Sequence, residues 1–122
     1  MALDRFVYWP LTAGPSQSEL TLLLEDYFGA AAEGIATEGS RLVVTMRGRT
    51  SGALRRVAHA PEAMRVIAQY ETDQNEPRTI EVFMHHHCID VITRHADEFT
   101  NAVAHGFAAL CARVWVGHLE EG

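Results

Sequence analysis

Residues 78–94, RTIEVFMHHHCIDVITR, decide the fold of this 122-residue chain. The large apolar residues fall at even positions before the histidines and at odd positions after them: Ile80, Val82 and Met84, then Ile89 and Val91. Because side chains alternate between the two faces along a strand, one unbroken strand would send these two sets to opposite sides. A turn or bulge near residues 85–88 returns both sets to one face. The stretch therefore predicts a buried β-hairpin at the centre of a small sheet.

Two amphipathic helices are predicted on either side of this hairpin. Ser16 and Glu19 form a capping-box pattern that starts the first helix. Its apolar face then continues at helical spacing, and Gly34 or Gly39 ends it: Leu20, Leu23, Leu24, Tyr27, Phe28, Ala31. Asp97 is the expected cap of the last helix, which ends at Gly117 and leaves a short acidic tail. Its apolar residues lie on one side: Phe99, Val103, Phe107, Leu110, Cys111 and Val114.

The remaining β-prone runs complete the expected sheet. Residues 5–9, stopped by Pro10, suit an edge or first strand. Residues 41–47 and 64–71 also predict strands, whereas residues 53–60 fit either a strand or a helical turn. The order β-α-β-(β)-β-β-β-α predicts one α+β domain spanning residues 1–122. We expect a mainly antiparallel sheet of four to six strands with two helices packed on one face.

The composition is that of a folded intracellular domain. Hydrophobic residues make up 48% of the chain, which is typical of a globular core. The first residues lack the pattern of a signal peptide, and no run approaches the roughly 20 apolar residues of a membrane span. The two cysteines, Cys88 and Cys111, are expected to be free thiols. These features predict a cytoplasmic protein without a membrane partner.

Charge is segregated along the chain, whose formal net charge is −6. No basic residue occurs between Phe6 and Ser40. Glu19, Asp26 and Glu33 are seven residues apart in this segment, which is almost two helical turns and predicts an acidic stripe opposite the apolar face. An ordinary solvated helix face is the simplest interpretation. The alternative is a surface that attracts a basic protein partner, with four contact residues: Glu19, Glu25, Asp26 and Glu33.

Other function classes receive less support from the sequence. The run from His85 to Cys88 has side chains that zinc or nickel prefers, but three adjacent histidines cannot all face one ion. Adjacent strand residues also point apart, so Cys88 and a neighbouring histidine do not predict a nucleophile–base pair. We therefore expect no catalytic residue, no metal and no cofactor. The arginines at positions 47, 49, 55 and 56 are a basic cluster, but the acidic balance and the absence of lysine argue against nucleic-acid binding.

The C-terminal third resembles small bacterial immunity proteins of polymorphic toxin systems. In that pattern a strand ending in Asp-Val-x-Thr-Arg leads into an Asp-capped, alanine-rich helix that ends in an aromatic residue and glycine. The matching positions are Asp90, Val91, Thr93, Arg94, Asp97, Trp115 and Gly117. The resemblance covers about a quarter of the chain and implies a protein that binds and occludes a cognate toxin domain. The acidic residues of the first helix predict that this toxin domain is basic.

The last helix supports an alternative function without catalysis. Opposite its large apolar residues lies a ridge of small side chains, Ala108 and Ala112, with Asn101 and His105 next to them. This ridge is expected to be covered by the protein's own loops, by a twin subunit or by another protein. A homodimer or larger homo-oligomer assembled through this helix, with a structural or regulatory role, is therefore the second hypothesis.

Overall fold

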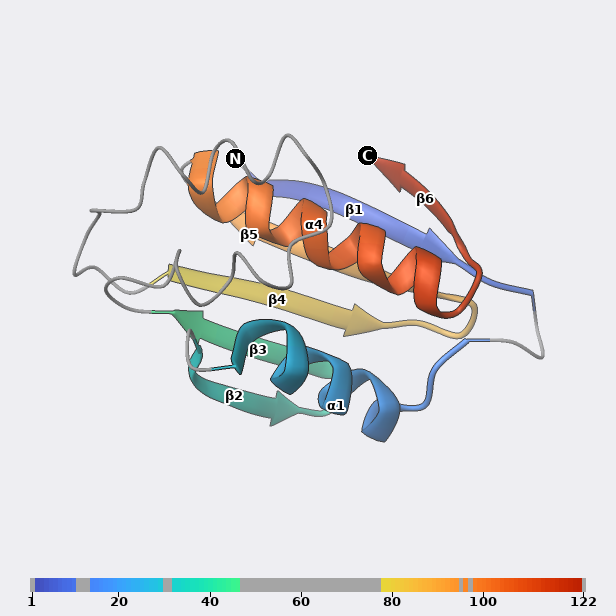
Figure 1. Ribbon diagram of the computed structural model, residues 1–122, viewed down its shortest axis with the longest axis horizontal. Helices are drawn as coiled ribbons and strands as arrows, with labels where there is room; N and C mark the ends of the chain where they lie inside the picture. Colours follow the sequence, from blue (N-terminus) through green and yellow to red (C-terminus); the bar gives the residue numbers. More distant parts are fainter. Residues whose placement is uncertain are drawn as a thin grey trace.

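The computed structural model describes residues 2–10, 14–29, 32–46, 78–94, 96 and 98–121. These residues form a six-stranded sheet in the order β2-β3-β4-β5-β1-β6, in which every neighbouring pair is antiparallel. Helices α1 and α4 lie side by side on one face of the sheet (Figure 1), which confirms the predicted α+β fold. The elements are β1 (Ala2–Tyr8), α1 (Gln17–Phe28), β2 (Ala32–Glu38), β3 (Arg41–Met46), β4 (Arg78–Met84), β5 (Cys88–Arg94), α4 (Glu98–Val114) and β6 (His118–Glu121).

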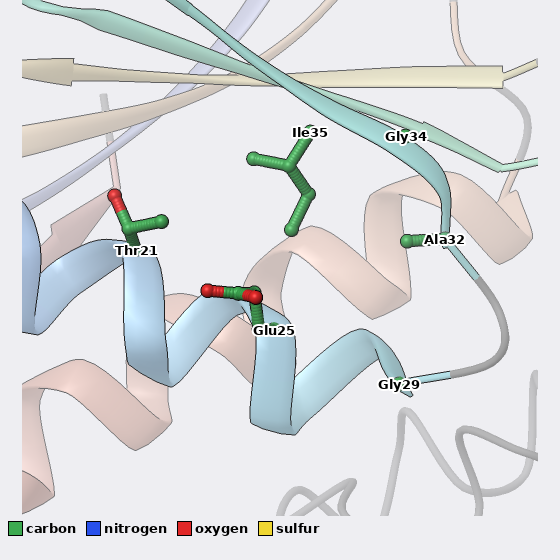
Figure 2. Close-up of a pocket in the computed structure, with 6 residues that line it drawn as sticks. All are labelled: Thr21, Glu25, Gly29, Ala32, Gly34 and Ile35. Carbon is green, nitrogen blue, oxygen red and sulfur yellow. The ribbon is translucent and has the colours of Figure 1, made fainter.

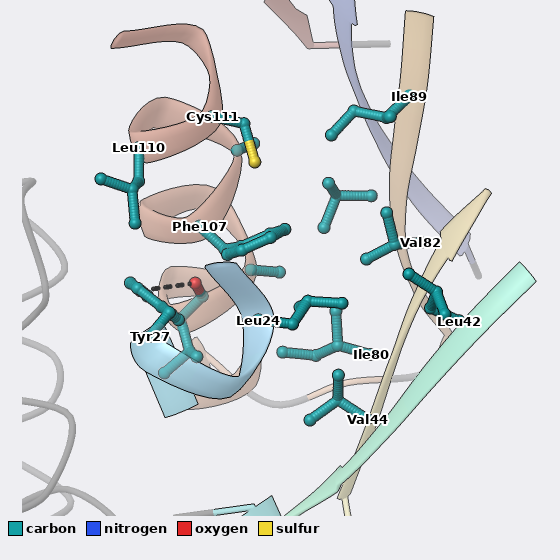
Figure 3. Close-up of a cluster of buried hydrophobic side chains, with 14 of the residues drawn as sticks. Leu24, Tyr27, Leu42, Val44, Ile80, Val82, Ile89, Phe107, Leu110 and Cys111 are labelled. Carbon is teal, nitrogen blue, oxygen red and sulfur yellow. Dashed lines mark hydrogen bonds between the residues drawn. The ribbon is translucent and has the colours of Figure 1, made fainter. Parts of the chain in front are cut away.

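The predicted central hairpin is confirmed as β4 and β5. Residues 85–87 connect the strands, and the amide N–H of His85 donates to the carbonyl oxygen of Cys88 at 2.8 Å. Met84 lies opposite Ile89. The apolar residues at even positions of β4 and those at odd positions of β5 therefore face the helices together, as the sequence predicted. The side chains between the sheet and the helices form one core (Figure 3). Its fully buried members include Ile80, Val82, Val91, Leu42, Val44, Leu24 and Phe107.

Helix α1 begins as the sequence predicts but ends earlier. Both bonds of the capping box are present: Ser16 N donates to Glu19 Oε1 at 2.9 Å, and Glu19 N donates to Ser16 Oγ at 3.1 Å. The helix ends at Phe28, where Gly29 adopts a φ of 49°. The prediction that it continues to Gly34 or Gly39 is therefore wrong. Residues 32–38 instead form β2, because pairing with β3 overrides their weak local preference.

The C-terminal tail is also a strand, which the sequence analysis did not predict. After α4, the amide of Gly117 donates to the carbonyl of Ala112 at 2.7 Å, and Val116 has a φ of 52°. This is the hydrogen-bonding pattern of a Schellman C-cap. It reverses the chain so that β6 pairs with β1, Leu119 lying opposite Val7. Strand β1 is consequently first in sequence but internal in the sheet.

The small ridge of α4 is covered by the chain itself. Ala108 has no exposed surface, and Ala112 is half-buried against the core. His105 Nδ1 lies 2.7 Å from Glu121 Oε1 on β6, and an Arg5 amino group on β1 donates to Asn101 Oδ1 at 3.1 Å. The ridge therefore faces β1 and β6 of the same chain.

Several sequence predictions lie outside the described residues. They are the strand at residues 64–71, the ambiguous segment at 53–60, the arginines at 47, 49, 55 and 56, Ala31, and the cap at Asp97. Neither helix of the described structure has the length and apolarity that crossing a membrane requires.

Candidate functional site

Helix α1 presents an acidic outer face. Glu19, Glu25 and Asp26 are exposed, and the opposite side of the helix buries Leu20, Leu24 and Tyr27. The predicted stripe is therefore present for Glu19 and Asp26. Glu33 is different, because it lies on β2 and not on the helix. Its position is at a bulge between Ala32 and Gly34, where the register with β3 shifts. We call Glu19, Glu25, Asp26 and Glu33 the acidic surface.

A shallow groove runs between α1 and β2. It has a volume of about 450 Å³ and is lined by Thr21, Glu25, Gly29, Ala32, Gly34 and Ile35. Figure 2 shows the side chains of Glu25 and Thr21 on the helix and that of Ile35 on the strand bordering the same space. The groove thus combines one carboxylate with an apolar wall. Glu33 lies between two of its lining residues in the sequence.

A second hollow continues along the outer side of α1. Its volume is also about 450 Å³, and its lining residues are Gln17, Ser18, Thr21, Leu22 and Glu25. Leu22 is 66% exposed, and Glu19, Glu25 and Asp26 lie three or four residues from it on the same helix. Glu25 borders both hollows, so the acidic surface has an exposed apolar residue at its centre and carboxylates around it.

Glu25 and Asp26 have no basic residue in their own segment of the chain. The first basic residue after Arg5 is Arg41. Arg41 is already paired, with Glu38 at 2.7 Å and Glu81 at 2.8 Å. Glu19 has a local role, because hydrogen bonds with Ser16 lower the pKa of its carboxyl group. Glu25 and Asp26, which are exposed almost two turns further along α1, are therefore the members of the surface best placed to meet a partner.

The histidine run forms the turn of the β4–β5 hairpin. His85 stacks on Phe83 with ring centroids 6.5 Å apart, and His86 meets His87 edge-on at 4.2 Å. Within the described part of the chain, no three histidine, cysteine, aspartate or glutamate side chains are arranged to hold a metal ion. Cys88 is half-buried, and burial together with the charge of Asp90 raises the pKa of its thiol. A nucleophilic cysteine requires the opposite shift.

One titratable group was missed by the sequence analysis. Asp90 lies at the centre of the sheet on the face away from the helices, between Phe83 on β4 and Phe6 on β1. It is only 6% exposed, and its Oδ1 has no hydrogen-bond partner among the residues that the structure describes. Burial, a hydrogen bond with Asp4 and the charge of Asp4 raise the pKa of Asp90 to about 7. The signal was present in the sequence as an acid in the middle of an apolar strand.

Comparison with protein-family models, with curated proteins and with solved structures found no match to this chain. The fold and the acidic surface are therefore the observations from which a function can be argued.

Proposed function

We propose that this protein binds a basic protein partner through the acidic surface and neutralises it by occlusion, as an immunity protein does to its toxin. The observation that carries the proposal is the placement of Glu25 and Asp26. Both carboxylates are exposed beside Leu22, and the chain from residue 6 to residue 40 holds no basic side chain to pair with them. The partner supplies the missing positive charge.

Long-range attraction would bring the two proteins together. Complementary charges mainly raise the rate of association and select against wrong partners, while a few buried anchors set the lifetime of the complex. Leu22 is the natural anchor here, because it is the most exposed leucine of the described residues and has a hollow on its flank. An interface of standard size buries about 1,600 Å² in total, enough to cover an active site.

The proposal is tested by affinity capture from the native host with the tagged protein, followed by elution at rising salt concentration and mass spectrometry. We expect one stoichiometric partner with a basic domain, whose enzymatic activity falls when purified protein is added back. The key variant is Glu25→Lys/Asp26→Lys, which leaves the capping carboxylate of Glu19 in place. Glu120→Lys, which reverses one exposed carboxylate on β6, is the control outside the acidic surface.

The double variant should lose the partner, and the control should retain it. Circular dichroism of both variants shows whether the fold is intact. Recovery of the same proteins by wild type and double variant, with the same salt dependence, would refute the proposal.

A further inference from the structure

Strand β2 is one edge of the described sheet and pairs only with β3 among the described strands. An edge strand presents alternate N–H and C=O groups that another strand can pair with. The four residues after the bulge, Gly34 to Thr37, carry no charge and have small or medium-sized side chains. This part of the edge therefore has none of the charged side chains that commonly protect an edge from pairing.

The groove described above lies along the same edge. A strand added next to β2 would turn alternate side chains toward the helix layer, because side chains alternate between the faces of a sheet. Those side chains would meet the space bordered by Ile35 and Glu25. Ile35 offers an apolar contact and Glu25 a carboxylate, so a segment with a basic side chain flanked by apolar ones is the best complement.

Charge favours a basic segment over a second copy of the chain as the strand that pairs with β2. A second copy of the chain, pairing β2 with β2, would bring Glu25 of one copy toward Glu25 of the other, and like charges facing each other destabilise an interface. The opposite edge, β6, is less suited to pairing. It has four residues, and its glutamates already pair with His105 at 2.7 Å and His118 at 3.3 Å.

We infer that an extended, basic segment of the protein partner adds to the sheet at β2 and places an arginine or lysine in the groove beside Glu25. This inference rests on the proposed function for the identity of the partner, but the pairing itself is a property of this chain. It belongs to the recognition mode in which main-chain hydrogen bonds give affinity and alternate side chains give specificity.

The test uses a fluorescent ten-residue peptide of alternating arginine and valine, with binding measured by fluorescence anisotropy. Two control peptides are needed: one with glutamate in place of arginine, and one N-methylated at alternate amides, which removes the hydrogen bonds of one strand edge. We expect binding of the basic peptide only, with amide chemical-shift changes in residues 34–38. Glu25→Gln should weaken binding about tenfold. Glu120→Gln, on the exposed opposite edge strand β6 and outside the acidic surface, should change it less than about twofold.

Equal binding of the N-methylated peptide, equal effects of the two substitutions, or shifts confined to β6 would each overturn the inference. Those outcomes are separate from the capture experiment. Loss of the captured partner in the Glu25→Lys/Asp26→Lys variant with no peptide pairing at β2 would uphold the proposed function and reject the strand addition. Pairing of the peptide with β2, without recovery of any basic partner from the host, would reject the proposed function and uphold the strand addition.

Discussion

The indole ring of Trp9 lies directly against Gly117. A Cβ atom at Gly117 would stand 2.5 Å from Nε1 of the ring, closer than real Cβ contacts allow. On another side of the ring, a Cβ atom at Gly14 would be 3.2 Å from Cε3, and Trp115 meets the ring edge-on at 6.2 Å. Trp9 thus joins the end of β1 to the turn between α4 and β6, and glycine provides the necessary space.

Gly117→Ala is expected to destabilise the protein by about 1–3 kcal/mol, because the added methyl group must displace a buried indole ring. The measurement is the free energy of unfolding from urea denaturation. Gly34→Ala is the control, since nothing lies within 4 Å of its Cβ position, and it should change stability by less than about 0.5 kcal/mol. Equal stabilities for the two variants would contradict the close contact.

Val116 is expected to be a stabilisation site. It is 85% exposed and has a φ of 52°, a conformation that is unfavourable for a β-branched residue. Val116→Gly should therefore raise stability by about 1 kcal/mol, seen as a higher urea midpoint with an unchanged slope. Val116→Ala keeps the Cβ atom and should gain much less. A lower midpoint for the glycine variant would show that the valine side chain makes a contact that outweighs its backbone strain.

Asp90 is expected to make stability depend on pH. Its folded pKa of about 7 is above its ordinary value of 3.8, so the folded protein holds a proton that the unfolded chain has released. The stabilisation from this group is complete below pH 3.8 and is lost as the pH rises to about 7. Above that pH the loss is constant. Asp90→Asn removes the titration and keeps a hydrogen-bond donor for Asp4.

The stability of Asp90→Asn relative to wild type should accordingly rise between pH 4 and pH 7 and then level off. Urea denaturation across this range measures the difference, and the carboxyl carbon chemical shift of Asp90 should titrate near the upper end. Asp26→Asn also removes one carboxylate, but from the exposed face of α1. If the stability of Asp26→Asn relative to wild type showed the same pH dependence, the change in net charge, and not the pair of Asp4 and Asp90, would be responsible.

Leu22 is expected to be the anchor of the acidic surface. Replacing this 66% exposed side chain by alanine should leave the free energy of unfolding almost unchanged. Affinity for the captured basic partner should nevertheless fall about tenfold or more, because a central apolar contact is lost. Titration calorimetry measures the change. Val114→Ala on α4 is the control, as Val114 is 48% exposed and outside the acidic surface. Equal losses for both variants would contradict a specific anchor.

The sequence predicted the elements that have strong local signals. Alternation that changes parity across residues 85–88 predicted the hairpin of β4 and β5, and the Ser16–Glu19 pattern predicted the start of α1. The apolar spacing of the last helix was confirmed for Phe99, Val103 and Phe107, which are buried. Val114 is half exposed, because it lies in the last turn of α4.

The candidate site was only partly predictable. The charges of Glu19, Glu25 and Asp26 could be placed on one helix, but Glu33 was assigned to that helix when it belongs to β2. Nothing in the local pattern indicated the groove between α1 and β2, because its two walls come from elements whose contact is tertiary. The proximity of Asp4 and Asp90 also required the register of β1 against β5, which pairs residues far apart in the chain.

The sequence by itself determined the α+β class, the central hairpin, the capping box and the absence of positive charge between residues 6 and 40. These features depend on periodicity and composition within short segments. Only the tertiary structure decided that α1 ends at Phe28, that the acidic tail is strand β6, and that Ala108 is buried within the chain. The physical reason is that weak local preferences in these segments are overridden by pairing with β3, by pairing with β1, and by packing against the sheet.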